Sequence, residues 1–214
     1  MEKSFWGPAT WHMIHAVAAG YKPEYRTAFK TFIGSLPFLL PCEYCRQHVQ
    51  QNISVLPLTD NVLSSADNLF LWSYSLHDLV NHQLKKPPSP SYILVKKYYF
   101  DNIKNPSFWG PSVWRVIHSF AASYRSIQPV SNAYMEFIYS LGGILPCADC
   151  RDNYRTALST MPLTFATLLN AHSVFLWSFL FHDLFNKKLH HASPPFEMVK
   201  EQYFNDNVCN KCGA

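Results

Sequence analysis

Apolar residues recur at helical spacing along the first hundred residues, in stripes separated by polar breaks. In the first stripe, Trp11, Ile14 and His15 lie three or four residues apart and follow Pro8, a residue that favours helix starts. No stretch shows the alternation typical of a strand. The pattern predicts four main helices and a short fifth, which begin near Pro8, Glu24, Pro41, Asp60 and Tyr92 and end near Ala19, Pro37, Ile53, Leu84 and Phe100.

The same pattern occurs a second time, 103 to 105 residues later. The repeated segments are Phe-Trp-Gly-Pro at 5–8 and 108–111, Phe-Leu-Trp-Ser at 70–73 and 175–178, and His-Asp-Leu at 77–79 and 182–184. This period is far longer than the units of solenoids, which have about 20–50 residues. We therefore expect an all-α protein with two copies of one domain, at 1–105 and 106–208, followed by a tail at 209–214.

Composition agrees with two small helical units and narrows the classes of function. With 48% hydrophobic residues, the 214-residue chain can fill a core in each copy. It has 7 glycines and no Gly-x-Gly-x-x-Gly, which argues against a Rossmann phosphate loop. The net charge of +4, without a basic run, favours neither nucleic acid nor membrane as a partner. No signal peptide or membrane span is evident, so we expect a cytoplasmic protein, or one in the host cytoplasm or virion if the chain is viral.

All six cysteines belong to Cys-x-x-Cys pairs, namely Cys42 with Cys45, Cys147 with Cys150, and Cys209 with Cys212. The first two pairs follow a proline, which we expect at the first helical position. Each pair would then lie at a helix N-terminus, where the dipole stabilises thiolate and lowers the thiol pKa. Zinc binding stays open as an alternative. Paired zinc ligands usually lie about 12–20 residues apart, whereas the first pair here is 102 residues from the second.

The ordered set of motifs resembles the Erv/ALR sulfhydryl oxidases, and its Trp-Gly-Pro and Pro-Cys-x-x-Cys-Arg segments are similar to the versions carried by large DNA viruses. The resemblance covers residues 5–100 and again 108–204. It implies two tandem helical bundles that each bind FAD and that pack as a pseudo-dimer, as the family's homodimers do. It also implies a thiol oxidase that forms disulfides in protein dithiols and reduces oxygen to hydrogen peroxide.

The resemblance also implies which residues contact the flavin. They are Trp11, His15, Tyr21, His77, Asn81, Leu84 and Lys86 in the first copy, and Trp114, His118, Tyr124, His182, Asn186 and Leu189 in the second. His191 stands in the second copy where the first has Lys86, and both copies have aspartate after the second histidine, where the family usually has asparagine. For each histidine, an ordinary hydrogen-bonded place in the core is the alternative.

The resemblance further implies a relay of disulfides. Cys45 or Cys150 would lie against the flavin, and Cys42 or Cys147 would meet the incoming thiol. The tail pair Cys209 and Cys212 is expected to shuttle electrons for both copies, since the first copy ends without such a pair.

Two other classes of protein remain as alternatives. One is a zinc-stabilised helical interaction module with the cysteines as ligands. The other is a flavin-free, thioredoxin-like exchanger, although no strand precedes the cysteine pairs.

Overall fold

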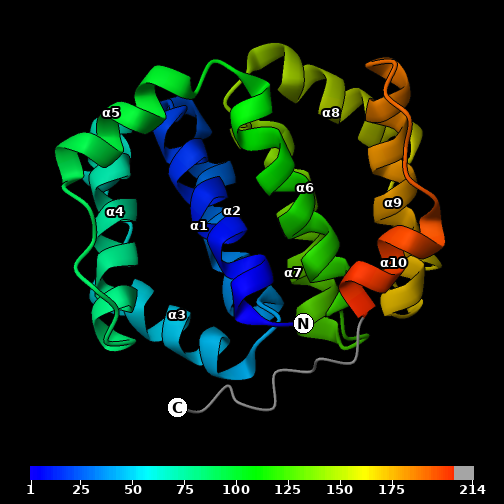
Figure 1. Ribbon diagram of the computed structural model, residues 1–214, viewed down its shortest axis with the longest axis horizontal. Coiled ribbons are helices and arrows are strands. Elements are labelled where there is room, and N and C mark those ends of the chain that lie inside the picture. Colours follow the sequence, from blue (N-terminus) through cyan, green and yellow to red (C-terminus); the bar gives the residue numbers. More distant parts are fainter. Residues whose placement is uncertain (205–214) are drawn as a thin grey trace.

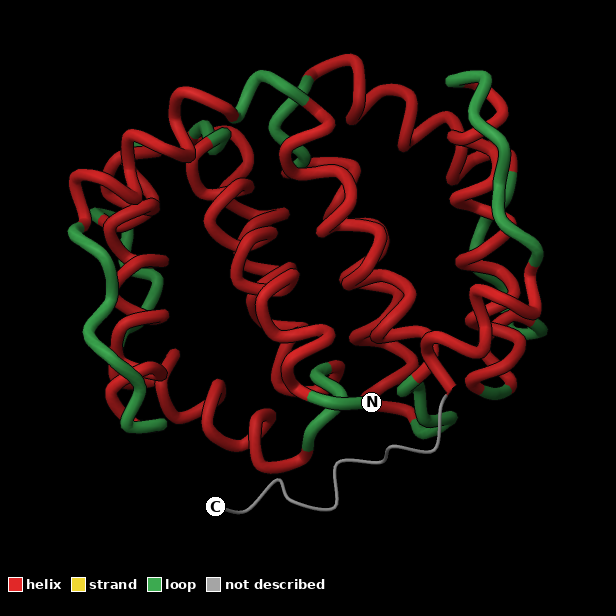
Figure 2. Tube along the Cα trace, in the orientation of Figure 1, coloured by secondary structure: helices red, strands yellow, loops and turns green. Residues whose placement is uncertain are grey.

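The computed structural model describes residues 1–204, and this part of the chain is helical without any strand (Figures 1 and 2). The tail cysteines Cys209 and Cys212 lie outside the described residues. The α-helices within 1–204 are α1 (Lys3–Ala19), α2 (Arg26–Leu39), α3 (Glu43–Val55), α4 (Ala66–Gln83), α5 (Tyr92–Asn102), α6 (Pro106–Ala122), α7 (Gln128–Ile144), α8 (Ala148–Thr160), α9 (Ala171–Lys188) and α10 (Phe196–Phe204). Short 3₁₀ turns lie at Pro23–Tyr25, Val62–Ser64 and Thr167–Leu169.

The predicted duplication is confirmed in the arrangement of the helices. Residues 1–105, here the first half, contain α1 to α5, and residues 106–204, the second half, contain α6 to α10. Each half has four longer helices and a shorter fifth. None of the helices in 1–204 combines the length and apolarity that a membrane span requires.

The two halves meet through equivalent helices, as expected for a pseudo-dimer. The main contacts between the halves join α2 to α7 and α1 to α6. Figure 1 shows α1 and α6 side by side in the middle of the molecule, with α4 and α9 at opposite sides. Buried aromatic rings cross this interface, for example Phe32 of α2, whose ring centroid lies 6.1 Å from that of Phe137 of α7. A continuous apolar core therefore joins the halves.

Two glycines mark places where the halves come very close. A Cβ atom on Gly20 would lie 2.7 Å from the Cβ of Pro146 and 2.9 Å from its Cα, and a Cβ on Gly143 would lie 2.7 Å from the Cβ of Ala28. Each contact joins one half to the other. Since packed atoms resist such overlap, any larger residue at these positions must push the halves apart.

Prolines do not mark helix boundaries as the sequence pattern predicted. Pro8 lies inside α1, which already begins at Lys3, and Pro37 lies inside α2, which continues to Leu39. A proline removes one backbone hydrogen bond from a helix. Pro8 is exposed and close to the helix start, so the carbonyl group that loses its partner can be solvated. Around Pro37, the buried side chains of Leu36 and Leu39 keep the segment packed as a helix.

Candidate redox site

In the first half, two histidines from different helices form a hydrogen-bonded chain. His15 of α1 is buried; its Nε2 lies 2.9 Å from Nδ1 of His77 of α4, and its Nδ1 lies 3.0 Å from the hydroxyl of Ser73. The Ser73 hydroxyl donates to the carbonyl of Phe70 at 2.8 Å, so it must accept from Nδ1–H of His15. Nε2 of His15 is then the acceptor for Nδ1–H of His77.

The second half repeats this chain. Nε2 of His118 lies 3.0 Å from Nδ1 of His182, and Nδ1 of His118 lies 2.9 Å from the hydroxyl of Ser178, which donates to the carbonyl of Phe175. The same donor and acceptor roles follow. In its neutral form, His182 therefore keeps a free lone pair on Nε2. The sequence pattern did not predict a role for this serine, although its recurrence in Phe-Leu-Trp-Ser was an available signal.

Burial keeps these histidines uncharged. Desolvation lowers the pKa of His15 and of His118 to about 3, and the neighbouring histidine of each pair adds to the effect. Desolvation likewise lowers the pKa of His77 and of His182 to about 4. All four imidazoles are neutral at pH 7, which is the state that the hydrogen-bond chains require.

A tryptophan stacks on the second histidine of each chain. The ring centroids of Trp11 and His77 lie 4.2 Å apart with planes inclined by 5°, and those of Trp114 and His182 lie 4.0 Å apart with planes inclined by 8°. The structure thus brings the predicted tryptophan and both predicted histidines of each half into one cluster, although they come from two separate helices.

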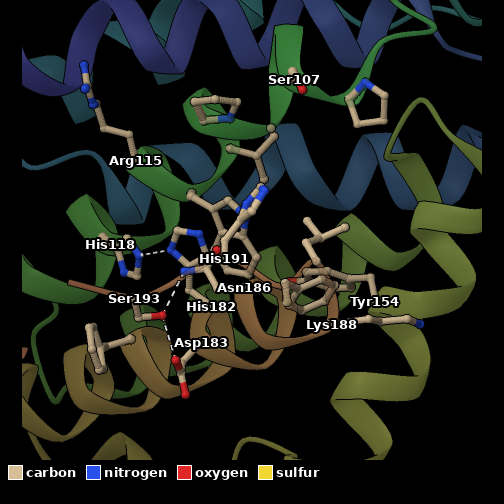
Figure 3. Close-up of a pocket in the computed structure, with 18 of the residues that line it drawn as sticks. Ser107, Arg115, His118, Tyr154, His182, Asp183, Asn186, Lys188, His191 and Ser193 are labelled. Atoms are coloured by element: carbon tan, nitrogen blue, oxygen red, sulfur yellow. Dashed lines mark hydrogen bonds between the residues drawn. The ribbon is translucent and has the colours of Figure 1, made fainter. Parts of the chain in front are cut away.

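In the second half, the cluster borders a cavity of about 720 Å³ (Figure 3). This volume lies within the range of about 300–1,000 Å³ that is usual for small-molecule sites. The cavity brings together the predicted residues Trp114, His118, Cys150, His182, Asn186 and Leu189. Tyr154, Phe185 and Tyr203 also line it and were not predicted as site residues.

Positive side chains surround part of this cavity. They are Arg115 and Lys188, and the imidazole of His191 is a further lining group (Figure 3). The carboxylate of Asp183 also lies there, but Lys187 forms an ion pair with it at 2.6 Å. Hydrogen bonds from Lys187 and from a serine hydroxyl lower the pKa of Asp183, so it stays ionised with its partners. The site is therefore suited to an anionic group.

The loop that follows the fourth long helix has the same backbone form in both halves. Lys85 and His190 adopt left-handed conformations, with φ of 51° and 57°. The backbone amide of the residue after each of these donates to the carbonyl of the predicted asparagine. Lys86 donates to Asn81 at 2.9 Å, and His191 donates to Asn186 at 2.8 Å. This turn is a Schellman cap built without glycine. The cap fixes the backbone at Lys86 in the first half and at the equivalent His191 in the second. His191 lines the cavity of its half.

The predicted asparagines hold this loop by their side chains. The amide of Asn81 donates to the hydroxyl of Ser89 at 3.1 Å, and that of Asn186 donates to Ser193 at 3.0 Å. In the first half, Leu84 and Lys86 are exposed.

The predicted tyrosines have a different environment. Tyr21 and Tyr124 are buried, and their hydroxyls donate to the carbonyls of Leu63 at 3.0 Å and of Leu168 at 2.9 Å. Tyr124 lies outside the set of residues that line the cavity. Each tyrosine thus connects the end of the first helix of its half to the loop before the fourth long helix.

The two described cysteine pairs are disulfide-bonded and lie at helix N-termini, as predicted, but the prolines before them are not the first helical residues. Cys42 is the N-cap of α3 and Cys147 is the N-cap of α8. The sulfur of each cap accepts a hydrogen bond at 3.2 Å from the backbone amide of the second cysteine, Cys45 or Cys150. The capping sulfur satisfies an amide that the helix leaves free, which explains why the helix begins after it.

Of the second pair, Cys150 lines the cavity and Cys147 does not. The arginine that follows this pair reaches the other half. Arg151 donates to the hydroxyl of Tyr25 at 2.7 Å and lies over its ring, 4.5 Å from the centroid. In the first half, Arg46 donates to the carbonyl of Leu40. Arg151 makes the equivalent bond to the carbonyl of Leu145, and burial and then the positive charge of Arg125 from the second half lower the pKa of Arg46.

Comparison with known proteins agrees with this geometry. The model of the Erv1 / Alr family matches residues 8–99 and again 111–204, so the chain belongs to this family and carries its domain twice. No solved structure matches the chain at a significant level.

Two viral relatives illustrate the similarity. A protein of Acanthamoeba polyphaga mimivirus, named a probable FAD-linked sulfhydryl oxidase, is 38% identical over 90 residues, which are 40% of this chain and 63% of the relative. An African swine fever virus protein, named an FAD-linked sulfhydryl oxidase, is 32% identical over 83 residues, or 38% of this chain and 67% of the relative.

Proposed function

We propose that the chain is an FAD-linked sulfhydryl oxidase, which oxidises thiols to disulfides with molecular oxygen as the electron acceptor. One observation carries the proposal: Cys150, which is disulfide-bonded to Cys147, lines the same cavity as the stacked residues Trp114 and His182. Membership of the Erv1 / Alr family and the names of the viral relatives support it.

The residues around the cavity fit FAD. The stacked Trp114 and His182 offer a flat aromatic surface to a planar ring system. Arg115 and Lys188 bring positive charge that suits a diphosphate. The lone pair on Nε2 of His182 would accept a hydrogen bond from a hydroxyl or N–H group of the bound cofactor. When bound, FAD would take two electrons from the reduced cysteine pair and deliver them to oxygen, which gives hydrogen peroxide.

The cysteines carry the chemistry of the chain itself. A substrate thiolate attacks the sulfur of the half-buried Cys147, which is not among the cavity-lining residues, and Cys150 leaves as a thiolate. The N-terminal end of α8 stabilises that thiolate. A second substrate thiolate then attacks the substrate sulfur of the mixed disulfide and releases Cys147. The substrate dithiol is thereby oxidised, and the Cys147–Cys150 pair is left with two electrons beside the cavity.

The first half is assigned the same role, because its histidine chain, tryptophan stack and capped disulfide repeat those of the second. Cys42 would meet the substrate and Cys45 would face the flavin. Residues 1–105 and 106–208 are then two oxidase domains, with Tyr21, Asn81, Leu84 and Lys86 as further flavin-site residues of the first. Leu189 completes the site of the second, and Tyr124, which lies outside the cavity lining, supports that site by holding the loop before α9. Residues 209–214 act as the shuttle, and protein dithiols are the substrates.

Two measurements on the purified full-length chain test the proposal. We expect a flavin absorbance spectrum, together with oxygen uptake and hydrogen peroxide formation when dithiothreitol is added. The double variant Cys45→Ala/Cys150→Ala should lose the peroxide formation. A colourless protein that carries zinc would contradict the proposal and favour a zinc-stabilised interaction module.

A further inference from the structure

Each half places one phenylalanine against the site of the other half. Phe5, near the start of α1, has its ring centroid 5.2 Å from that of Tyr203 of α10, in an edge-to-face arrangement at 84°. Phe108, near the start of α6, lies 5.5 Å from Tyr99 of α5, at 73°. Figure 1 shows the N-terminal end of α1 beside α10. Since Phe5 and Phe108 are equivalent in the repeat, and so are Tyr99 and Tyr203, the exchange is reciprocal.

Both tyrosines belong to the sites. Tyr203 lines the cavity of the second half, and its ring centroid lies 5.5 Å from that of His118. Tyr99 lies 5.3 Å from His15 in the first half. Both tyrosine rings are buried. Each ring thus has the inner histidine of its own half on one side and a phenylalanine of the other half on another.

A second contact accompanies each exchange. The guanidinium of Arg115, a cavity-lining residue, lies 5.2 Å from the ring centroid of Phe5, close enough for a cation–π interaction. The residue equivalent to Arg115 in the first half is His12, whose ring lies 4.7 Å from that of Phe108. Phe5 therefore touches two residues that line the cavity of the second half, Arg115 and Tyr203.

We propose that Phe5 is a positioning residue for the site of the second half and that Phe108 is one for the site of the first half. Each phenylalanine limits where its tyrosine can move, and Phe5 also holds the cation Arg115. Each half thereby completes the flavin site of the other. This inference rests on the proposed function, which supplies its ligand, FAD. It makes each site dependent on the pairing of the two halves.

Reciprocal alanine variants of the full-length chain test the inference by FAD titration of the apoprotein. Trp11→Ala silences the first site, so that this background reports the second, and Trp114→Ala does the reverse. We expect Phe5→Ala to weaken FAD binding roughly three- to tenfold at the second site, as the loss of one aromatic pair would, and to leave the first site unchanged. Phe108→Ala should have the opposite pattern.

Two controls separate positioning from a general loss of structure. Phe165→Ala, at a side chain that is 91% exposed, should leave both sites unchanged. Phe5→Tyr, which keeps the ring, should restore binding at the second site. Equal weakening of both sites by Phe5→Ala, or no weakening at either, would overturn the inference.

A second readout does not depend on FAD. In the flavin-free protein, Phe5→Ala should shift the ring resonances of His118 more than those of His15 in ¹⁵N-histidine NMR spectra, and Phe108→Ala should do the reverse. Equal shifts would again overturn the inference. A chain that shows the crossed NMR pattern but binds no FAD would contradict the proposed function alone.

Discussion

Trp114 and His182 lie with their rings nearly parallel, at a centroid distance of 4.0 Å and an angle of 8°, although one comes from α6 and the other from α9. The stack depends on the hydrogen bond from His182 to His118, since this bond fixes the orientation of the outer imidazole. Trp11 and His77 repeat the relationship in the first half. The chain thus contains two equivalent tryptophan–histidine stacks, one in each half.

Loss of one tryptophan–histidine stack should remove one bound flavin. We predict that Trp114→Ala lowers the bound FAD from two molecules per chain to one, because the ring system loses its stacking surface. Trp114→Phe should retain most of the second flavin. The ratio of flavin absorbance to protein concentration measures both variants. An unchanged ratio in Trp114→Ala would show that Trp114 does not contact the flavin.

The serine beside the inner histidine should matter for stability. We predict that Ser178→Ala lowers the free energy of unfolding by about 1–3 kcal/mol, because the buried Nδ1–H of His118 loses its acceptor. Urea denaturation measures the change. The matched control is Ser159→Ala in α8, whose exposed hydroxyl donates within its own helix. Its effect should stay within about 0.5 kcal/mol, and an equally small loss for Ser178→Ala would refute the assigned hydrogen bond.

Stability should fall as the pH drops below 6.5, before most carboxylates titrate. Burial lowers the pKa of His118 to about 3 and that of His182 to about 4 in the folded state. The unfolded state, with histidine pKa values near 6.5, binds more protons on acidification, so the folded state loses stability as the pH falls. From pH 7 to pH 5, each fully buried histidine contributes a loss of up to about 2 kcal/mol.

Urea denaturation at several pH values checks this expectation. The variant His118→Gln should be less stable at pH 7 but should show a smaller loss between pH 7 and pH 5 than the wild-type chain. A loss of the same size in both proteins would contradict the assignment of neutral histidines.

The tail pair should matter most for large substrates. We predict that replacing Cys209 and Cys212 with serine slows the oxidation of a folded protein dithiol much more than that of dithiothreitol, because a small dithiol can reach the half-buried Cys147 without a shuttle. Peroxide formation with each substrate measures the difference. Equal slowing for both substrates, or none, would remove the shuttle role.

The sequence pattern predicted those features that a single helix or a repeat determines. The helical class, the duplication and the N-terminal position of Cys42 and Cys147 follow from spacing within a segment or from its recurrence, and the structure confirms them. The boundary expected at Pro8 was wrong, because a proline near a helix start frees only a carbonyl that water can reach, and α2 continues past Pro37 because Leu36 and Leu39 are buried in the core.

Features that depend on contacts between distant segments could not be predicted. The acceptor role of Ser178 appears only when α9 packs on α6, and the contact of Phe5 with Tyr203 only when the halves pair. The hydroxyl of Tyr124 could equally have faced a ligand or a backbone carbonyl, and only the position of Leu168 decides for the carbonyl. A single sequence does not show which of its distant residues come into contact.

If a reactive disulfide and a bound flavin share each site, electrons from a dithiol must reach the flavin through the cysteines. The measurement is the loss of flavin absorbance under anaerobic conditions after addition of dithiothreitol. We predict that the wild-type chain loses its flavin absorbance, whereas Cys45→Ala/Cys150→Ala binds FAD normally and keeps its absorbance. Loss of absorbance at the wild-type rate in the double variant would contradict the account.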